Sequence, residues 1–240
     1  MLCSRPKASG KSYTLALLLA LIGSGLASGA LGHTITGNDA NYVQAIDGPA
    51  IGPFIYLGAK HMVTGYDHLL YLFGVVFFLR RPVQVLQFVS LFAIGHSLTL
   101  LAGVLLNLRI NAFLIDAIIG FSIVYKAFEN LGGLARLGRW RPNPKAAVFV
   151  FGLFHGLGLA SKLQAFTLSD NGLLINMLSF NVGVEIGQLL ALSGMLLLLA
   201  VWRARPGFPG SALAVNTLLM SGGFVLTVYQ LMAWANDSPY

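Results

Sequence analysis

Six predominantly apolar stretches follow one another along most of this chain, each long enough to cross a hydrocarbon core about 30 Å thick as a helix. They cover residues 52–79, 83–107, 111–132, 146–165, 172–202 and 211–235. Hydrocarbon offers no partner to an exposed backbone N–H or C=O group, so such stretches form helices. The sequence therefore predicts an all-α fold, a polytopic membrane helix bundle of six transmembrane helices within residues 51–240. The fifth stretch is long enough to be tilted or to extend past the bilayer.

Composition supports a membrane protein and excludes several other classes. Of the 240 residues, 56% are hydrophobic and 10% are charged, whereas soluble domains carry about 25% charged residues. The net charge of +7 comes from short clusters between the apolar stretches, an arrangement that membrane topology explains better than nucleic-acid binding. We therefore expect the lipid bilayer as a partner and no nucleic acid.

The first 32 residues are typical of a secretory signal peptide. Arg5, Lys7 and Lys11 form a basic front, residues 13–22 an apolar centre, and small residues follow. Cleavage just before His33 fits this pattern, as does cleavage after Gly29 or Ala30, and an uncleaved anchor helix is the alternative. Residues 33–50 are polar and are predicted to form an extracytoplasmic segment.

The charged loops predict the orientation of the chain. Eight positive residues lie between the first and second, third and fourth, and fifth and sixth stretches: Arg80, Arg81, Arg136, Arg139, Arg141, Lys145, Arg203 and Arg205. The opposite side has Arg109 and Lys162, with Lys60 nearby. By the positive-inside rule the eight are cytoplasmic, so both mature termini are predicted to be extracytoplasmic.

Ionisable residues are concentrated in the first stretch, where His61, Asp67 and His68 fall within eight positions. Such residues are costly in a membrane and usually functional. On a regular helix the two histidines lie about 10 Å apart along the axis, too far to share one ion. Either Gly65 marks a distortion that draws them together, or they are successive stations for a moving ion. Asp67 is a ligand or instead orients a neighbouring histidine.

The later stretches add polar residues at similar depth. His96 and His155 lie near the middle of the second and fourth, and Asn181, Glu185 and Gln188 share one helix face of the fifth. In the third, Lys126 and Glu129 are spaced to pair with each other. The predicted metal ligands are His61, Asp67, His68, His96, His155 and Glu185, and the predicted supporting residues are Asn181, Gln188, Asp116 and Thr64.

The donor types limit the metal. The single cysteine, Cys3, lies in the segment expected to be removed, so no thiolate ligand is available. Imidazole with carboxylate suits divalent nickel, cobalt, zinc or copper. The scattered methionines are expected to serve in packing.

Several segments together resemble the HupE/UreJ family of nickel permeases, in its broader branch. The pattern His61-x5-Asp67-His68 comes first, and GHSLTL (95–100), FGLFHGLGLA (151–160) and FNVGVEIGQ (180–188) follow in the same order. The resemblance implies secondary uptake of Ni(II) across a bacterial inner membrane, supplying hydrogenase or urease assembly, with His61, Asp67 and His68 essential. At the first histidine this chain reads His61-Met62, where those permeases usually have His-Pro.

The predicted function is therefore a non-enzymatic permease, driven by a gradient or the membrane potential, because the chain has no phosphate-binding P-loop. One alternative is an intramembrane metalloenzyme with an open coordination position. Another is a subunit of a larger complex, with histidines that bind haem or copper. A related possibility is a mature N-terminus at His33, whose free amine and imidazole would form a small copper chelate. A second copy of the chain, or metalloenzyme maturation machinery, is left open as a partner.

Overall fold

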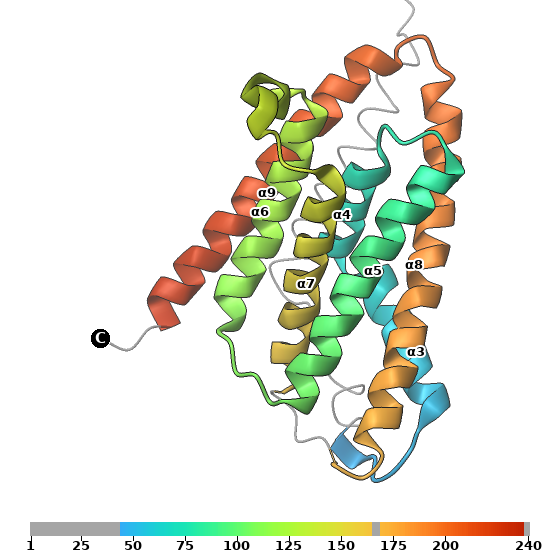
Figure 1. The fold of residues 1–240 in the computed structure, drawn as a ribbon, viewed down its shortest axis with the longest axis vertical. Coiled ribbons are helices and arrows are strands. Elements are labelled where there is room, and N and C mark those ends of the chain that lie inside the picture. Colours follow the sequence, from blue (N-terminus) through green and yellow to red (C-terminus); the bar gives the residue numbers. More distant parts are fainter. Residues whose placement is uncertain (1–43, 165–168, 238–240) are drawn as a thin grey trace, which may run out of the picture. The chain divides into compact units, whose positions relative to one another are not determined.

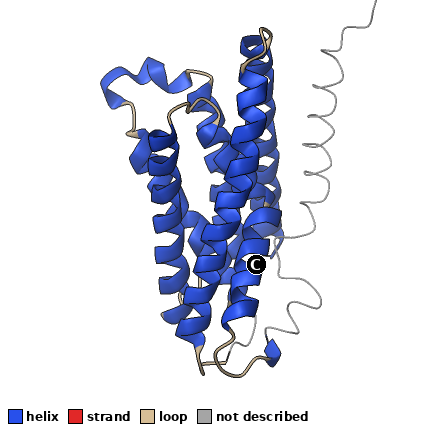
Figure 2. Cartoon of the chain, turned by 90° about the vertical axis from the view of Figure 1, so that its right-hand side faces the viewer, coloured by secondary structure: helices blue, strands red, loops and turns tan. Residues whose placement is uncertain are grey.

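The computed structural model describes residues 44–164 and 169–237, and within them Figure 2 shows helices and loops only. The helices are α3 (Ile51–Thr64), α4 (Tyr66–Val76), α5 (Pro82–Leu105), α6 (Ala112–Asn130), the 3-10 helix η1 (Gly133–Trp140), α7 (Pro144–Leu163), α8 (Leu173–Arg203) and α9 (Phe208–Asp237). The predicted all-α fold is confirmed for this part of the chain. The predicted signal peptide, residues 1–32, lies outside the described residues.

Four of the described helices are long and apolar enough to cross a membrane, namely Pro82–Leu105, Pro144–Leu163, Leu173–Arg203 and Phe208–Asn236. The other two predicted spans differ from these for physical reasons. The stretch 52–79 forms two shorter helices, α3 and α4. α6 is long enough but carries three charged residues, Asp116, Lys126 and Glu129.

The helices pack most extensively in the pairs α3 with α8, α5 with α7, and α6 with α9, and Figure 1 shows α7 between α6 and α5. Glycines bring the backbones into close contact in each pair. Gly183 of α8 lies against the carbonyl of Ile55 in α3, and Gly156 of α7 lies against the carbonyl of His96 in α5. Small residues at helix contacts are the usual way for membrane helices to approach closely.

The loops that carry the eight basic residues lie at one end of the helices. The α4–α5 loop, the η1 region between α6 and α7, and the α8–α9 loop all lie at the top of Figure 1. The α5–α6 loop lies at the opposite end. The alternation of charge along the sequence therefore corresponds to two ends of the structure.

Arg203, at the end of α8, caps the C-terminus of α4. Its guanidinium donates hydrogen bonds to the carbonyls of Val76 (2.6 Å), Phe77 (2.6 and 3.2 Å) and Leu79 (2.9 Å). The last carbonyls of a helix have no partner within it, so this one side chain satisfies several of them. It holds the end of the short helix α4 against α8.

Replacing Arg203 with glutamine should lower the free energy of unfolding by about 1.5–3 kcal/mol, because hydrogen bonds from a charged donor are lost at buried carbonyls. Thermal unfolding of the purified protein would measure this. The neighbouring Arg205 is exposed, so Arg205→Gln is a matched control that should change stability little. Equal stability of the two variants would mean that the cap contributes nothing.

Candidate metal centre

The first predicted span is broken at Gly65. α3 ends at Thr64 and α4 begins at Tyr66, and Gly65 between them is extended (φ −74°, ψ 100°). Backbone hydrogen bonds connect Gly65 to both helices. Gly65 N donates to His61 O of α3 (2.8 Å), and Leu69 N of α4 donates to Gly65 O (3.1 Å). A Cβ at position 65 would lie 2.9 Å from His68 Nδ1 and 3.0 Å from His61 O. Glycine is therefore the residue that fits at this point.

The break brings the two histidines of this segment together. The ring centroids of His61 and His68 lie 5.0 Å apart, with the rings nearly perpendicular. On an uninterrupted helix their positions would be about 10 Å apart along the axis. Of the two arrangements that the sequence left open, the structure has the distortion at Gly65.

Asp67 orients His68. Its Oδ1 lies 2.7 Å from His68 Nδ1 and also accepts a hydrogen bond of 2.8 Å from the His68 backbone N–H. An ionised carboxylate only accepts hydrogen bonds, so the proton of the His68 ring is placed on Nδ1 and the lone pair on Nε2. This carboxylate–imidazole contact is the usual support of a metal-binding histidine. His68 is only 2% exposed, and its Nε2 has no hydrogen-bond partner within the described residues.

His96 of α5 completes a group of three imidazoles. Its ring lies 5.6 Å from that of His68, and one ring nitrogen from each of His61, His68 and His96 falls within 4.8 Å of the others. Nitrogens that share a metal at about 2.1 Å lie at most about 4.2 Å apart, so a small rotation of the rings would close the site. His96 is fully buried, and neither ring nitrogen has a partner within the described residues.

His155 of α7 lies beside this triad. Its ring is 5.0 Å from His68, and its Nδ1 is 2.7 Å from the carbonyl of Phe151 in its own helix. The carbonyl can only accept, so Nδ1 donates and the proton of His155 is placed there. All four predicted histidines are therefore neighbours, although the group whose nitrogens could share one metal contains three of them.

Aromatic rings enclose the imidazoles. Phe92 of α5 lies 5.0 Å from the ring of His155 and 6.3 Å from that of His68, Tyr71 of α4 lies 5.3 Å from His155, and Phe180 of α8 lies 6.1 Å from His61. The sequence gives no sign of this role for them, because an aromatic residue in an apolar stretch carries no signal of its own. They surround the ligands with low-polarity material, which strengthens electrostatic interactions at the site.

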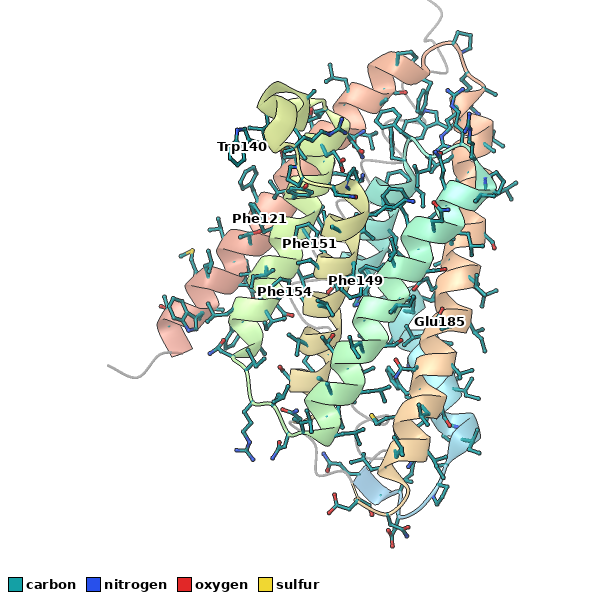
Figure 3. All side chains as sticks on the ribbon, in the orientation of Figure 1. Phe121, Trp140, Phe149, Phe151, Phe154 and Glu185 are labelled. Carbon is teal, nitrogen blue, oxygen red and sulfur yellow. The ribbon has the colours of Figure 1, made fainter. Side chains whose placement is uncertain are left out.

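Other predicted residues lie outside the triad. Glu185 is exposed on α8, as Figure 3 shows, whereas Asn181 and Gln188 are buried. Asp116 pairs with Lys162 at 2.9 Å. Thr64 is exposed and donates a 2.8 Å hydrogen bond to the carbonyl of Lys60 in its own helix.

The third span contains the ion pair that the sequence suggested. Lys126 Nζ and Glu129 Oε2 of α6 lie 2.7 Å apart, and Arg141 adds a longer contact of 3.5 Å to the same carboxylate. Lys126 and Glu129 compensate each other, Arg141 adds a second positive charge beside the carboxylate, and the triad contains none of the three.

An Asp67→Asn variant should bind a transition metal about 10- to 100-fold more weakly and stay folded, because the carboxylate orients His68 and raises its basicity. Equilibrium binding to the purified protein measures the affinity, and X-ray absorption counts the ligands. The number of imidazole nitrogens bound to the metal should be unchanged. The control is Asp170→Asn, which removes an exposed carboxylate from a loop and should leave the affinity unchanged. Loss of a metal–oxygen neighbour would instead make Asp67 a direct ligand.

The fold and the site define an all-helical membrane protein with a buried cluster of imidazoles at a broken helix. A family model described as HupE / UreJ protein matches residues 37–238, which is most of the chain. The chain therefore belongs to the HupE/UreJ family. No curated protein and no solved structure matches it.

Proposed function

We propose that this protein is a secondary permease for a divalent transition-metal ion, with Ni(II) as the first candidate and Co(II), Zn(II) and Cu(II) as the others. The observation that carries the proposal is the group of three imidazoles, His61, His68 and His96, whose ring nitrogens converge within 4.8 Å. Imidazole ligands suit these metals, whereas Mg²⁺ and Ca²⁺ prefer oxygen. Family membership agrees with transport.

The broken helix supports transport over permanent binding. In many secondary transporters the substrate binds near the middle of the membrane, where a spanning helix is interrupted. Here His61 lies in the last turn of α3 and His68 in the first turn of α4, on either side of Gly65. A change of backbone angles at Gly65 would separate the two ligands and so weaken the site, as release of the ion requires.

The burial of the ligands gives the proposed path a direction. His61 is partly exposed, whereas His68 and His96 are buried. His61 would capture the ion from the extracytoplasmic side, and His68 and His96 would complete its ligand set. Neutral imidazoles leave the charge of the ion uncompensated, and the buried Asp67 supplies one negative charge next to them. His155, in contact with His68, is placed to receive the ion next.

The proposed setting is the bacterial inner membrane. Six spans would be made by α3 with α4, α5, α6, α7, α8 and α9, after cleavage of a signal peptide. The basic loops at one end of the helices would be cytoplasmic and both mature termini extracytoplasmic. The membrane potential would then favour uptake by about 2.3 kcal/mol per charge per 100 mV, without nucleotide hydrolysis.

The test is accumulation of radioactive nickel by cells that express the chain, compared with cells that carry the empty vector. Saturable uptake above the vector level is expected, and competition by cobalt, zinc and copper would rank the substrates. No uptake of any of these ions by cells with correctly inserted protein would overturn the proposal.

One observation also favours an intramembrane metalloenzyme. Three imidazoles with a further coordination position left over are a common catalytic zinc set. Metal analysis separates the two functions, because a permease has to release its ion whereas an enzyme keeps it. Stoichiometric metal retained through purification, together with absent uptake, would favour the enzyme.

A further inference from the structure

The segment that joins α6 to the first turn of α7, residues 131–145, is strongly basic. It contains four basic residues and no acidic residue: Arg136, Arg139, Arg141 and Lys145. Arg141 lies 3.5 Å from Glu129 of α6, but Glu129 is already paired with Lys126 at 2.7 Å. Because two cations share this carboxylate, it does not balance the charge of the segment.

Apolar side chains of the same segment are increasingly exposed along it. Leu134 is 5% exposed, Leu137 is 47% exposed and Trp140 is 76% exposed. They recur at every third residue of η1, which packs on α6 and bends at Gly138, where φ is 52°. The start of η1 is therefore held against the protein, and its end presents a tryptophan outward, as Figure 3 shows.

Trp140 lies where the boundary between hydrocarbon and lipid head groups is expected. Phe121 and Phe128 of α6 are exposed and seven residues apart, so they share a face of the helix that lipid would cover. The ring of Phe128 lies against Gly133, at the start of η1. In Figure 3, Trp140 lies beyond Phe121 on the same outer side, toward the end that carries the basic loops. Tryptophan is enriched at this boundary because its ring is apolar and its N–H is polar.

We propose that the basic segment binds the head group of an anionic phospholipid, with Trp140 against the upper acyl chains and the arginines at the phosphate. A guanidinium presents paired donors that match phosphate oxygens. Arg141 is half-exposed, and its 3.5 Å contact with Glu129 is longer than a hydrogen bond, so its donors can reach a phosphate. The site does not depend on which ion the protein transports.

A lipid with net negative charge fits both parts of the segment better than other sources of phosphate. A zwitterionic phospholipid carries a positive group next to its phosphate, which reduces its attraction to a basic cluster. A free phosphate ester has no acyl chain for Trp140 to contact. Basic clusters next to a membrane span are a known type of site for anionic lipids.

The site can be tested through the fluorescence of Trp140. The purified full chain in detergent micelles is titrated with phosphatidylglycerol whose acyl chains carry bromine, which quenches tryptophan on contact. The signal of Trp140 is the difference between the native protein and Trp140→Phe, because both contain the other two tryptophans, Trp202 and Trp234. Brominated phosphatidylglycerol should quench Trp140 at a concentration at least about tenfold lower than brominated phosphatidylcholine does. Soluble glycerol phosphate should not reverse the quenching.

Variants locate the charges that bind the lipid. The double variant Arg139→Gln/Arg141→Gln should need more than about tenfold more phosphatidylglycerol, because each basic residue near an anionic surface contributes about fivefold in affinity. Arg205→Gln is the matched control, since Arg205 is an exposed basic residue in another loop at the same end. It should leave the phosphatidylglycerol titration within about twofold of the native one.

The results decide the proposal whatever the outcome of nickel uptake. Equal quenching of Trp140 by the two lipids, or no quenching by either, would overturn the lipid site, and neither result depends on the arginine variants being folded. Reversal by glycerol phosphate would make the segment a site for soluble phosphates instead. Equal titrations of the double variant and Arg205→Gln would show that Arg139 and Arg141 do not hold the lipid.

Discussion

His68→Ala is expected to reduce nickel uptake to the level of cells that carry the empty vector. His68 is the central ring of the cluster, with the rings of His61, His155 and His96 at 5.0, 5.0 and 5.6 Å. Its removal takes one of three ligands and leaves the buried Asp67 carboxylate without its imidazole partner. Loss of a supporting contact already costs about 10- to 100-fold in metal affinity, so loss of the ligand should cost more than about 100-fold.

The chain offers a matched control for this variant. Asp170 is an exposed loop residue outside the triad, and Asp170→Asn should transport nickel like the native protein. Membrane fractions show whether each variant is inserted, and equilibrium binding shows whether the affinity has changed. If inserted His68→Ala protein takes up nickel at the native rate, the triad is not part of the transport path.

The sequence predicted the histidines of the centre but not the shape of the segment that holds them. Glycine inside an apolar helical stretch is compatible with an unbroken helix and with a break, because the cost of glycine in a helix is only about 1 kcal/mol. The break at Gly65 is accompanied by contacts of α3 with α8, which join distant parts of the sequence. Local spacing cannot show these.

Glu185 shows a second limit of spacing arguments. At about 100° per residue, positions 181, 185 and 188 fall within an arc of about 60°, so a shared face is correctly predicted. The edge between the buried and the exposed surface of α8 falls inside this arc, and Glu185 lies on the exposed side. The rotation of a helix about its axis depends on its neighbours, here the glycine contacts with α3.

Interactions along one helix were more predictable than contacts between helices. The Lys126–Glu129 pair follows from i, i+3 spacing within α6. The Arg203 cap on α4 joins residues more than 120 positions apart, and nothing in the local sequence indicates it. The grouping of His96 with His61 and His68 was an inference from similar depth in three spans, and the structure supports it through the contacts of α5 with α4.

Gly156→Ala is expected to destabilise the protein strongly and to weaken the metal centre at the same time. Gly156 of α7 lies against the backbone carbonyl of His96 and the hydroxyl of Thr99, and a Cβ there would overlap both. Backbone cannot rotate away as a side chain can, so α5 and α7 must separate, which costs about 3 kcal/mol or more. The separation would also move the backbone of His96 and disturb the hydrogen bond of 2.7 Å from Thr99 Oγ1 to Leu153 O.

Gly194→Ala is the matched substitution, because a Cβ at Gly194 of α8 meets no atom within 4 Å. Alanine favours a helix over glycine by about 1 kcal/mol, so this variant should be as stable as the native protein or slightly more stable. Thermal unfolding of the two purified variants compares their stability, and equilibrium metal binding compares their centres. If Gly156→Ala unfolds at the native temperature with native metal affinity, the close contact of α5 with α7 does not hold His96 in place.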